Sequence, residues 1–208
     1  MDPKYQSLFT PWKIGNCEIK NRIVLTSMGG TSIFGWMEPH HFDKEAANFL
    51  LDRAKNNVGL ILPGIAPIRN VIGGNWLYKS KSSFRHLKPF MDELHKTGAK
   101  MFVQLTAGFG RSFAISSMME MLATNKVLGA IAKPFINIDQ LTMSASPNPN
   151  RWSDKVPSRA MTVDEIHEFI KAFGKTAKMC KDAGVDGVEI HAVHEGYLLD
   201  QFTMKYTN

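Results

Sequence analysis

Short apolar runs alternate with longer amphipathic segments along this chain, and this alternation limits the fold more than any other feature. The runs are largely apolar rather than alternately apolar and polar, which is typical of strands buried on both faces of a sheet. The predicted strands are residues 22–26, 58–62, 100–105 and 188–191. The predicted helices between them are residues 43–56, 87–96 and 162–184. Strands and helices in this order predict an α/β fold with a parallel sheet.

Capping and turn residues mark several of these boundaries. Asp43 is placed to cap the first helix, and the run from Thr162 to Glu165 has the spacing of a capping box. Gly98 follows the second helix as a stop signal. Before the first of these strands, Gly15 and Asn16 separate two short β-type segments and predict a hairpin.

The number of strand–helix units leaves two architectures open. The chain has 208 residues and at most four such units, whereas a closed eightfold barrel needs about 250 residues. No GxGxxG sequence follows the first strand, which argues against a dinucleotide-binding fold. The pattern therefore predicts either a small open α/β domain or the first half of a (β/α)8 barrel.

A long polar and irregular segment covers residues 106–159. It is too long for a plain connection, and residues 145–150 (ASPNPN) cannot form a regular helix or strand. Residues 115–132 can form a helix within it. A disordered linker is the alternative, but the apolar content of residues 118–138 argues against it. We expect the segment to form the mouth of an active site.

Composition and charge exclude several function classes. The 25 Lys and Arg residues exceed the 19 Asp and Glu residues by 25 − 19 = 6, and they are dispersed rather than clustered, so we expect no nucleic-acid partner. No apolar run approaches about 18 residues and the N-terminus has no secretory signal, so we expect no membrane segment. The two cysteines, Cys17 and Cys180, are far apart. They predict a reducing, cytoplasmic location.

Polar residues gather at the end of the fourth predicted strand. His191, His194, Glu195 and Tyr197 lie within seven residues, at the strand end where parallel-sheet enzymes place reactive groups. Two histidines can bind a metal, hydrogen-bond an electron-rich ligand or transfer protons. The spacing is not HExxH and no third ligand is implied, so we expect no metal site.

Two further residues are candidates for ligand contacts. Gln104 is the lone amide in an apolar strand, and its carboxamide can make paired hydrogen bonds to a ring amide such as a pyrimidine edge. The neighbouring backbone can also satisfy it. Arg111 follows the third strand and is a candidate for binding the substrate through an anionic group.

Four sequence blocks together resemble the Old Yellow Enzyme family. They are Asn21–Val24 (NRIV), Gln104, residues 188–191 (VEIH) and residues 195–202 (EGYLLDQF). The longer run HAVHEGYLLDQF, with GIAP at residues 64–67, is most similar to the 2-enoate reductase and 2,4-dienoyl-CoA reductase branch. The resemblance covers nearly the whole chain and is weakest across residues 113–141.

The resemblance implies a flavin-dependent (β/α)8 barrel that reduces activated C=C bonds. It implies that Gln104 hydrogen-bonds the pyrimidine edge of FMN, that His191 and His194 hold an electron-withdrawing oxygen of the substrate, and that Tyr197 donates a proton. The residues that it places along the flavin are Ser27, Met28, Gly29, Pro63 and Gly64. Relatives often carry Cys or Thr at the position of Gly29, so that side-chain contact with the flavin is absent here.

The resemblance also implies which partners the protein uses. These are NAD(P)H and a small unsaturated substrate. The resemblance is also compatible with a homo-oligomer. In the family four more strand–helix units, which hold the flavin phosphate, complete the barrel. Larger members add a 4Fe–4S segment and FAD and NAD(P)H domains.

We therefore expect residues 1–208 to be the N-terminal part of a barrel domain and to be inactive alone. Two other readings remain open: a non-catalytic, self-associating half-barrel module, and a barrel enzyme that uses the histidine pair for a metal.

Overall fold

Five short parallel strands form the centre of the computed structural model, which describes residues 2–192, 194 and 196–208. The strands are β3 (Val24–Leu25), β4 (Leu60–Ile61), β5 (Ala66–Pro67), β6 (Lys100–Thr106) and β7 (Gly187–Ile190). β3 pairs with β4. β4 pairs with the start of β6, and β5 pairs with the end of β6. β7 also pairs with β6. Each predicted strand contains or overlaps one of these strands, so the parallel sheet is confirmed.

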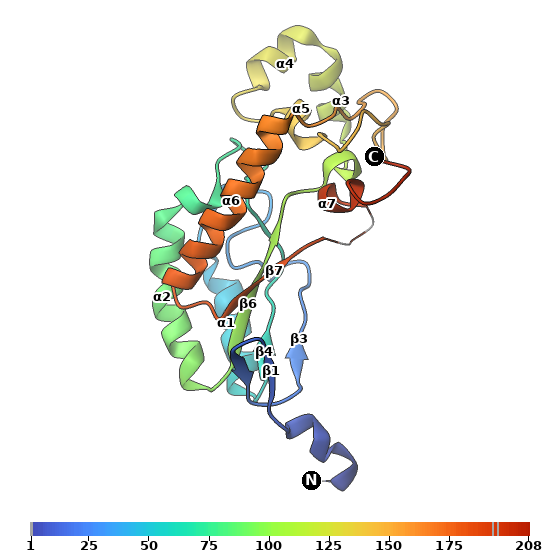
Figure 1. Ribbon diagram of the computed structural model, residues 1–208. Coiled ribbons are helices and arrows are strands. Elements are labelled where there is room, and N and C mark those ends of the chain that lie inside the picture. Colours follow the sequence, from blue (N-terminus) through green and yellow to red (C-terminus); the bar gives the residue numbers. More distant parts are fainter. Residues whose placement is uncertain (1, 193, 195) are drawn as a thin grey trace.

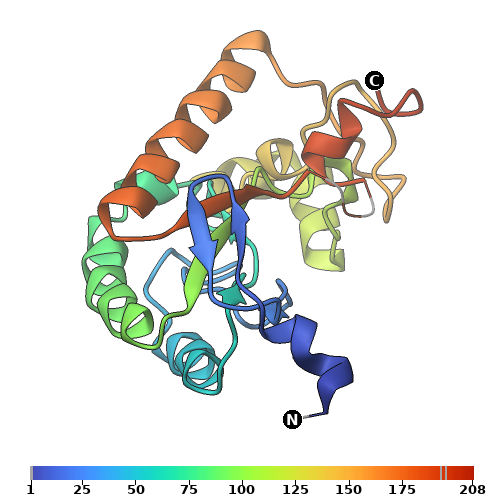
Figure 2. The ribbon, with the colours of Figure 1, turned by 60° about the horizontal axis from the view of Figure 1, so that its bottom comes forward.

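Three helices cover one side of the sheet, as Figures 1 and 2 show. They are α1 (Lys44–Lys55), α2 (Lys81–Lys96) and α6 (Val163–Asp182). The sheet is curved, and these helices lie on its convex side. The buried core lies between the two layers and includes Leu50, Leu87, Met91, Met101, Val103, Leu105 and Cys180. A curved parallel sheet with helices outside is the geometry of part of a (β/α)8 barrel.

The predicted helix boundaries are correct at two N-termini and wrong at a third. Asp43 accepts hydrogen bonds from the backbone N–H groups of Glu45 and Ala46 at 2.9 and 3.0 Å, and Thr162 and Glu165 form the expected capping box. α2, in contrast, begins at Lys81 rather than at residue 87. Its added first turns bury Phe84, which places apolar contacts against the core.

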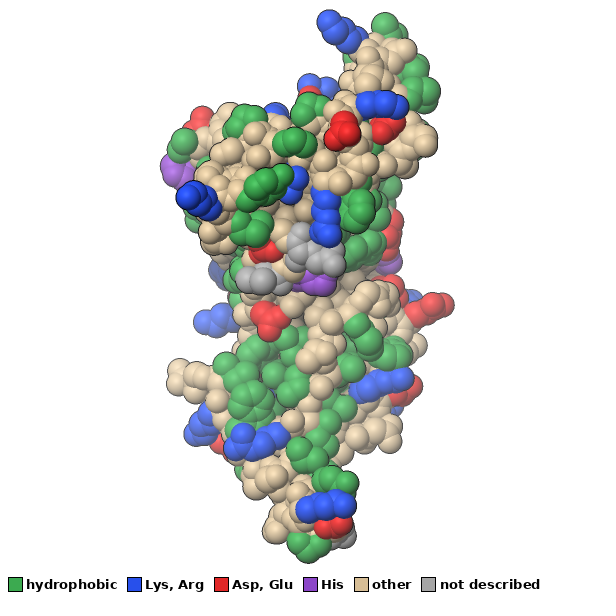
Figure 3. Space-filling view, turned by 90° about the vertical axis from the view of Figure 1, so that its right-hand side faces the viewer, with side chains coloured by type: hydrophobic (Ala, Val, Ile, Leu, Met, Phe, Trp, Pro, Cys, Tyr) green, Lys and Arg blue, Asp and Glu red, His purple; other side chains and the backbone are tan. Residues whose placement is uncertain are grey.

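A hairpin packs against the lower ends of the strands in the view of Figure 1. β1 (Trp12–Ile14) and β2 (Cys17–Ile19) pair antiparallel around Gly15, whose φ is +55°, as the sequence predicts. They follow a 3₁₀ segment, η1 (Pro3–Phe9). Ile19 packs with Leu60 and Leu62 in a second buried cluster, which Trp12, Cys17, Val24 and Phe102 adjoin. Figure 3 shows hydrophobic side chains gathered on this side of the molecule.

The long segment after β6 folds into a helical cap above the strand ends (Figure 1). It contains η3 (Gly110–Ser112), α3 (Ser117–Thr124), α4 (Lys126–Ala132) and α5 (Ile138–Leu141). The single helix expected over residues 115–132 is wrong. Asn125 is extended, and its side chain caps α4 instead. Gly129 allows α4 to pack closely, because a Cβ there would lie 2.4 Å from the Leu122 carbonyl oxygen.

Two short elements complete the described structure: η2 (Leu77–Lys79) before α2, and α7 (Leu198–Gln201) after β7. Among the described residues, no helix combines the length and the apolar character that a membrane span requires.

Candidate functional site

A cleft of about 590 Å³ opens at the carboxyl ends of the parallel strands. Segments that follow β3, β4 and β7 line it together with Gln104 of β6, which is the arrangement by which parallel sheets assemble sites from distant segments. Most of the predicted site residues line this cleft: Ser27, Met28, Gly29, Gly64, Gln104, His191, His194 and Tyr197. The structure therefore brings together segments that lie near opposite ends of the sequence.

Pro63 and Arg111 are not among the residues that line the cleft. Pro63 is buried before Gly64. The Nε of Arg111 donates a hydrogen bond to the Pro149 carbonyl oxygen at 2.9 Å, and its guanidinium group lies 5.5 Å from the ring centre of Tyr206. Arg111 thus holds the cap and the C-terminal segment together, and the structure does not place it where a ligand in the cleft would meet it.

Gln104 joins β6 to β7 through its side chain. The register pairs Gln104 with Glu189, so the two side chains lie next to each other on the same face of the sheet. The Nε2 of Gln104 donates to Glu189 Oε1, and the Oε1 of Gln104 accepts from His191 Nδ1 at 2.9 Å. Each amide atom keeps one unused site, because the NH₂ group has two hydrogens and the oxygen two lone pairs.

His191 lines the cleft and carries an unsatisfied buried atom. Its Nε2 is buried and has no hydrogen-bond partner among the described residues. Burial lowers the pKa of the imidazole, and the nearby charge of His194 lowers it further. A buried polar atom without a partner is uncommon in a folded protein, and a catalytic role or a bound group is one of its explanations. This nitrogen is therefore the clearest sign of a ligand-binding function.

Aromatic rings pack together around Tyr197. The Tyr197 ring stacks on His191 with centres 5.4 Å apart and planes at 18°, and it lies 4.9 Å from the ring of His194. Phe109 meets Tyr197 edge-on at 4.6 Å and contacts Trp36 on its other side. These contacts fix the orientation of Tyr197 relative to both histidines.

The loop that carries His194 and Tyr197 is held by Asp200. Its Oδ2 accepts hydrogen bonds from the backbone N–H groups of His194, Gly196 and Tyr197 at 2.8, 3.0 and 3.1 Å. Asp200 is buried at the start of α7. Val193 and Glu195, which belong to the same sequence motif, lie outside the described residues.

Sequence reasoning did not identify several residues of the site. Trp36 and Ser32 lie in a glycine-containing loop that has no periodic signal. Glu189 was detectable, since it lies two positions before His191 and strand periodicity of two places both on one face. Asp200 was also detectable, because it stands three residues after Tyr197, the spacing of a capping box.

Metal ligands do not gather in the part of the chain that is described. Residues 2–192, 194 and 196–208 contain no group of three or more His, Cys, Asp or Glu side chains placed to hold an ion.

Comparisons with known proteins place the chain in a family. Residues 7–208 match the model of the NADH:flavin oxidoreductase / NADH oxidase family, and the chain belongs to that family. It is 36% identical to the cinnamate reductase of Clostridium sporogenes over 215 aligned residues, which cover all of this chain and 29% of that protein.

Solved structures agree with the fold. 2-Naphthoyl-CoA reductase, in complex with 2-naphthoyl-CoA, superposes with a TM-score of 0.73 at 23% identity, covering 98% of this chain and 30% of that one. The Old Yellow Enzyme from Pichia sp. AKU4542 superposes with a TM-score of 0.67 at 26% identity, covering 97% and 50%. The resemblance to the Old Yellow Enzyme family is confirmed, and the chain forms the first four strand–helix units of a (β/α)8 barrel. It spans only about a third to a half of these relatives.

The residues present fit the flavin that the family implies. Gln104 has one free donor and one free acceptor position at the cleft. Gly29 lines the cleft, and a Cβ at this position would meet no atom within 4 Å, so space is open there. His191, whose Nε2 is buried without a partner among the described residues, lines the same cleft.

Proposed function

We propose that this chain forms the cofactor- and substrate-facing half of an FMN-dependent reductase of activated C=C bonds. The observation that carries the proposal is the unpartnered Nε2 of His191, which shares one cleft with Gln104 and Tyr197. Membership of the flavin oxidoreductase family and the similarity to a cinnamate reductase support it. Suitable substrates are 2-enoates, enoyl thioesters and enones, in which an oxygen activates the double bond.

In this proposal Gln104 hydrogen-bonds the pyrimidine edge of FMN through its two unused positions. Ser27, Met28 and Gly29 lie against the flavin on the β3 side, and Gly64 lies against it after β4. When bound and reduced, FMN supplies a hydride to the β-carbon of the substrate. NAD(P)H is the proposed source of the reducing electrons.

The histidines and the tyrosine act on the substrate itself. His191 and His194 hydrogen-bond the activating oxygen, where negative charge builds up as the double bond is reduced. Tyr197 donates a proton to the α-carbon. The ring stacking of Tyr197 on His191 keeps donor and oxygen-binding group in a fixed relation.

We propose that further strand–helix units complete the barrel in the working enzyme. Phosphate sites of such barrels lie after the seventh and eighth strands, and this chain contains the first four. The 4Fe–4S cluster, the FAD and the NAD(P)H domain of larger family members are part of the same proposal, as is a cytoplasmic location.

The test is the substitution Tyr197→Phe in a protein in which the barrel is complete, with each half-reaction measured separately. Removing only the hydroxyl should slow the reaction of reduced flavin with an alkene by roughly 10²–10⁴-fold, the usual contribution of a general acid. Reduction of the flavin by NADH should be nearly unchanged. Full activity with the alkene contradicts the role of Tyr197, and an equal loss in both half-reactions indicates structural damage instead.

A further inference from the structure

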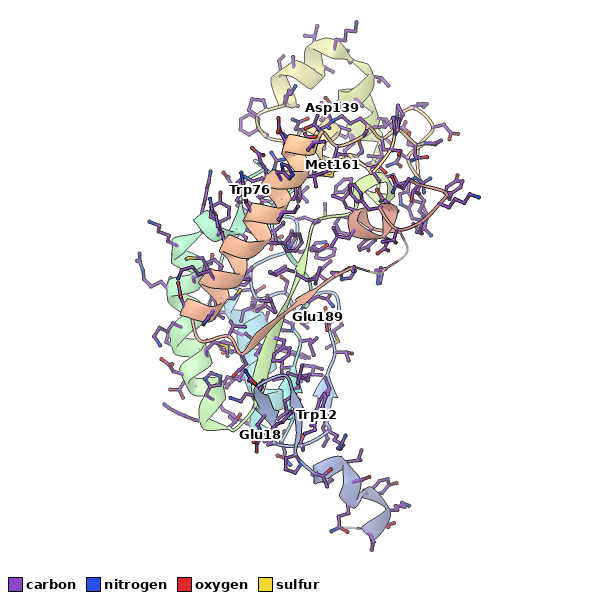
Figure 4. All side chains as sticks on the ribbon, in the orientation of Figure 1. Trp12, Glu18, Trp76, Asp139, Met161 and Glu189 are labelled. Atoms are coloured by element: carbon purple, nitrogen blue, oxygen red, sulfur yellow. The ribbon has the colours of Figure 1, made fainter. Side chains whose placement is uncertain are left out.

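Glu189 connects to His191 through Gln104. Glu189 and Gln104 are register partners on β7 and β6, and Figure 4 shows Glu189 on the side of the sheet away from α2 and α6. Gln104 donates to the Glu189 carboxylate and accepts from His191 Nδ1. In the described part of the chain, the Gln104 amide has no other hydrogen-bond partner. The three side chains therefore form one line of hydrogen bonds that ends at His191, which lines the cleft.

The direction of this line is determined at its Glu189 end. A carboxylate can only accept hydrogen bonds, so the NH₂ group of Gln104 must point toward Glu189. The amide oxygen then points toward His191, and because that oxygen can only accept, Nδ1 of His191 carries the proton. A neutral imidazole has a single N–H group, so its Nε2 is left with a lone pair.

Without the carboxylate, a second hydrogen-bonding arrangement of Gln104 and His191 fits the same heavy-atom positions. The amide of Gln104 can turn over, so that its NH₂ group donates to Nδ1 of His191 and the proton lies on Nε2. The heavy atoms stay in place, but the cleft then meets a donor at Nε2 rather than an acceptor. Glu189 is the one partner of Gln104 in the described structure that distinguishes the two arrangements.

We infer that Glu189 is a positioning residue, which selects the Nδ1-protonated tautomer of His191 by fixing the orientation of the Gln104 amide. The consequence for catalysis rests on the proposed function. Neutral His191 offers the cleft an acceptor, and it can donate to a substrate oxygen only after it takes up a proton at Nε2. In that imidazolium form Nδ1 still donates to Gln104, so the line of hydrogen bonds is kept.

The tautomer can be measured directly by ¹⁵N NMR of the imidazole in the protein with a complete barrel, without flavin or substrate. The measurement is made at a pH where His191 is neutral, and His191→Gln assigns the signal. In the unaltered protein we expect Nδ1–H to dominate. Glu189→Gln keeps the size and polarity of the side chain but lets it donate as well as accept, so the ratio of Nε2–H to Nδ1–H should rise by about tenfold or more. Glu18→Gln, on the exposed hairpin, is the matched control and should leave the ratio unchanged.

A double-substitution cycle tests the route through Gln104. In a Gln104→Leu background, Glu189→Gln should have no further effect on the tautomer ratio, because the connection is already broken. A wild-type protein with the proton on Nε2, an unchanged ratio in Glu189→Gln, or an undiminished effect in the Gln104→Leu background would each overturn the inference. Loss of reductase activity with the expected tautomers would count against the proposed function alone.

Discussion

At the scale of single residues, the cleft contains polar groups that can form more hydrogen bonds than the protein itself provides. Gln104 keeps a free donor and acceptor, and His191 keeps a free nitrogen. Polar groups are costly to bury in this state, so their presence in one cleft favours a ligand over a purely structural role. Substitutions at and beside these two residues test that role.

Replacing Gln104 with Leu should weaken flavin binding while the fold is kept. Two hydrogen bonds to the ring, at about 0.5–1.5 kcal/mol each, correspond to a loss of about 1–3 kcal/mol in binding free energy. Flavin affinity is measured by fluorescence titration of the protein with a complete barrel, and Gln6→Leu, on the exposed N-terminal segment, serves as the control. Equal flavin affinity and reduction potential in wild type and Gln104→Leu would show that Gln104 does not contact the flavin.

The pKa of His191 should lie below that of an ordinary histidine, and His194→Gln should raise it. Burial is the main cause of the lowering and the charge of His194 is the second, so removing His194 removes only the second. Because the folded-state pKa lies below the unfolded one, His191 contributes stability above its unfolded pKa of about 6.5, and this contribution is lost as the pH falls through the folded pKa. An NMR pH titration of the ring signals gives both values. An unchanged or lower pKa of His191 in the His194→Gln variant would contradict this prediction.

At the scale of secondary-structure elements, capping hydrogen bonds at the N-termini of α6 and α7 stabilise the segments that precede these helices. The capping box of α6 is strengthened by Arg159, whose guanidinium group bonds both carboxylate oxygens of Glu165. This pairing lowers the pKa of Glu165 to about 2. At α7, Asp200 orders the loop with the candidate catalytic groups by accepting three backbone N–H groups.

Glu165→Gln should destabilise the protein at neutral pH but not in strong acid. A depressed carboxyl pKa contributes stability above the unfolded value of about 4.3, and this contribution is lost as the pH falls toward 2. At pH 7 the expected loss in the free energy of unfolding is about 1–3 kcal/mol. Urea unfolding at several pH values measures it. Glu168→Gln, one turn along α6, is the control, and a pH-independent difference between wild type and Glu165→Gln would contradict the assignment.

Asp200→Ala should lower the rate of alkene reduction more than it weakens flavin binding. Three backbone N–H groups lose their acceptor, and the loop with His194 and Tyr197 is no longer held. Asp200→Asn keeps an oxygen acceptor and should recover part of the rate. Single-turnover kinetics and flavin titration compare the two variants with Asp154→Ala, an exposed control. Parallel losses of alkene reduction and flavin binding would show that Asp200 supports the fold as a whole instead.

At the scale of the whole molecule, the half-barrel exposes surfaces that a closed barrel covers. Val188 and Ile190, on the edge strand β7, are 36% and 47% exposed. β3 and β7 each have one sheet edge that is unpaired within the described residues. Exposed apolar strand edges favour association with other chains.

The 208-residue chain, expressed alone, should self-associate and bind FMN weakly. Replacing Val188 and Ile190 together by Thr should reduce the association, because two exposed apolar side chains of the edge strand are replaced by polar ones while β propensity is kept. Light scattering across a concentration series gives the size, and flavin absorbance after desalting gives the occupancy. A monodisperse monomer with stoichiometric FMN that reduces an enoate would be the opposite outcome. The same substitutions at Val163 and Ile170, both exposed on α6, test whether apolar exposure alone is sufficient.

The sequence alone predicted the parallel strands, the main helices and most of the polar residues that line the cleft. Apolar runs defined the parallel strands, and local hydrogen-bonding patterns at Asp43 and Thr162 defined two helix starts, because these signals act within a few residues. The position of α2 and the break at Asn125 were not predicted. They depend on packing against the core and on close helix contacts, which local spacing does not encode.

Only the tertiary structure decided how the site residues are connected. The sequence brought Gln104, His191 and Tyr197 forward as separate candidates, and it also proposed Arg111, which the fold directs to Pro149 instead. The register of β6 and β7 placed Glu189 beside Gln104 and joined both to His191. Strand register and loop packing arise from long-range contacts, so a residue's type indicates what it can bond, whereas the folded chain determines what it meets.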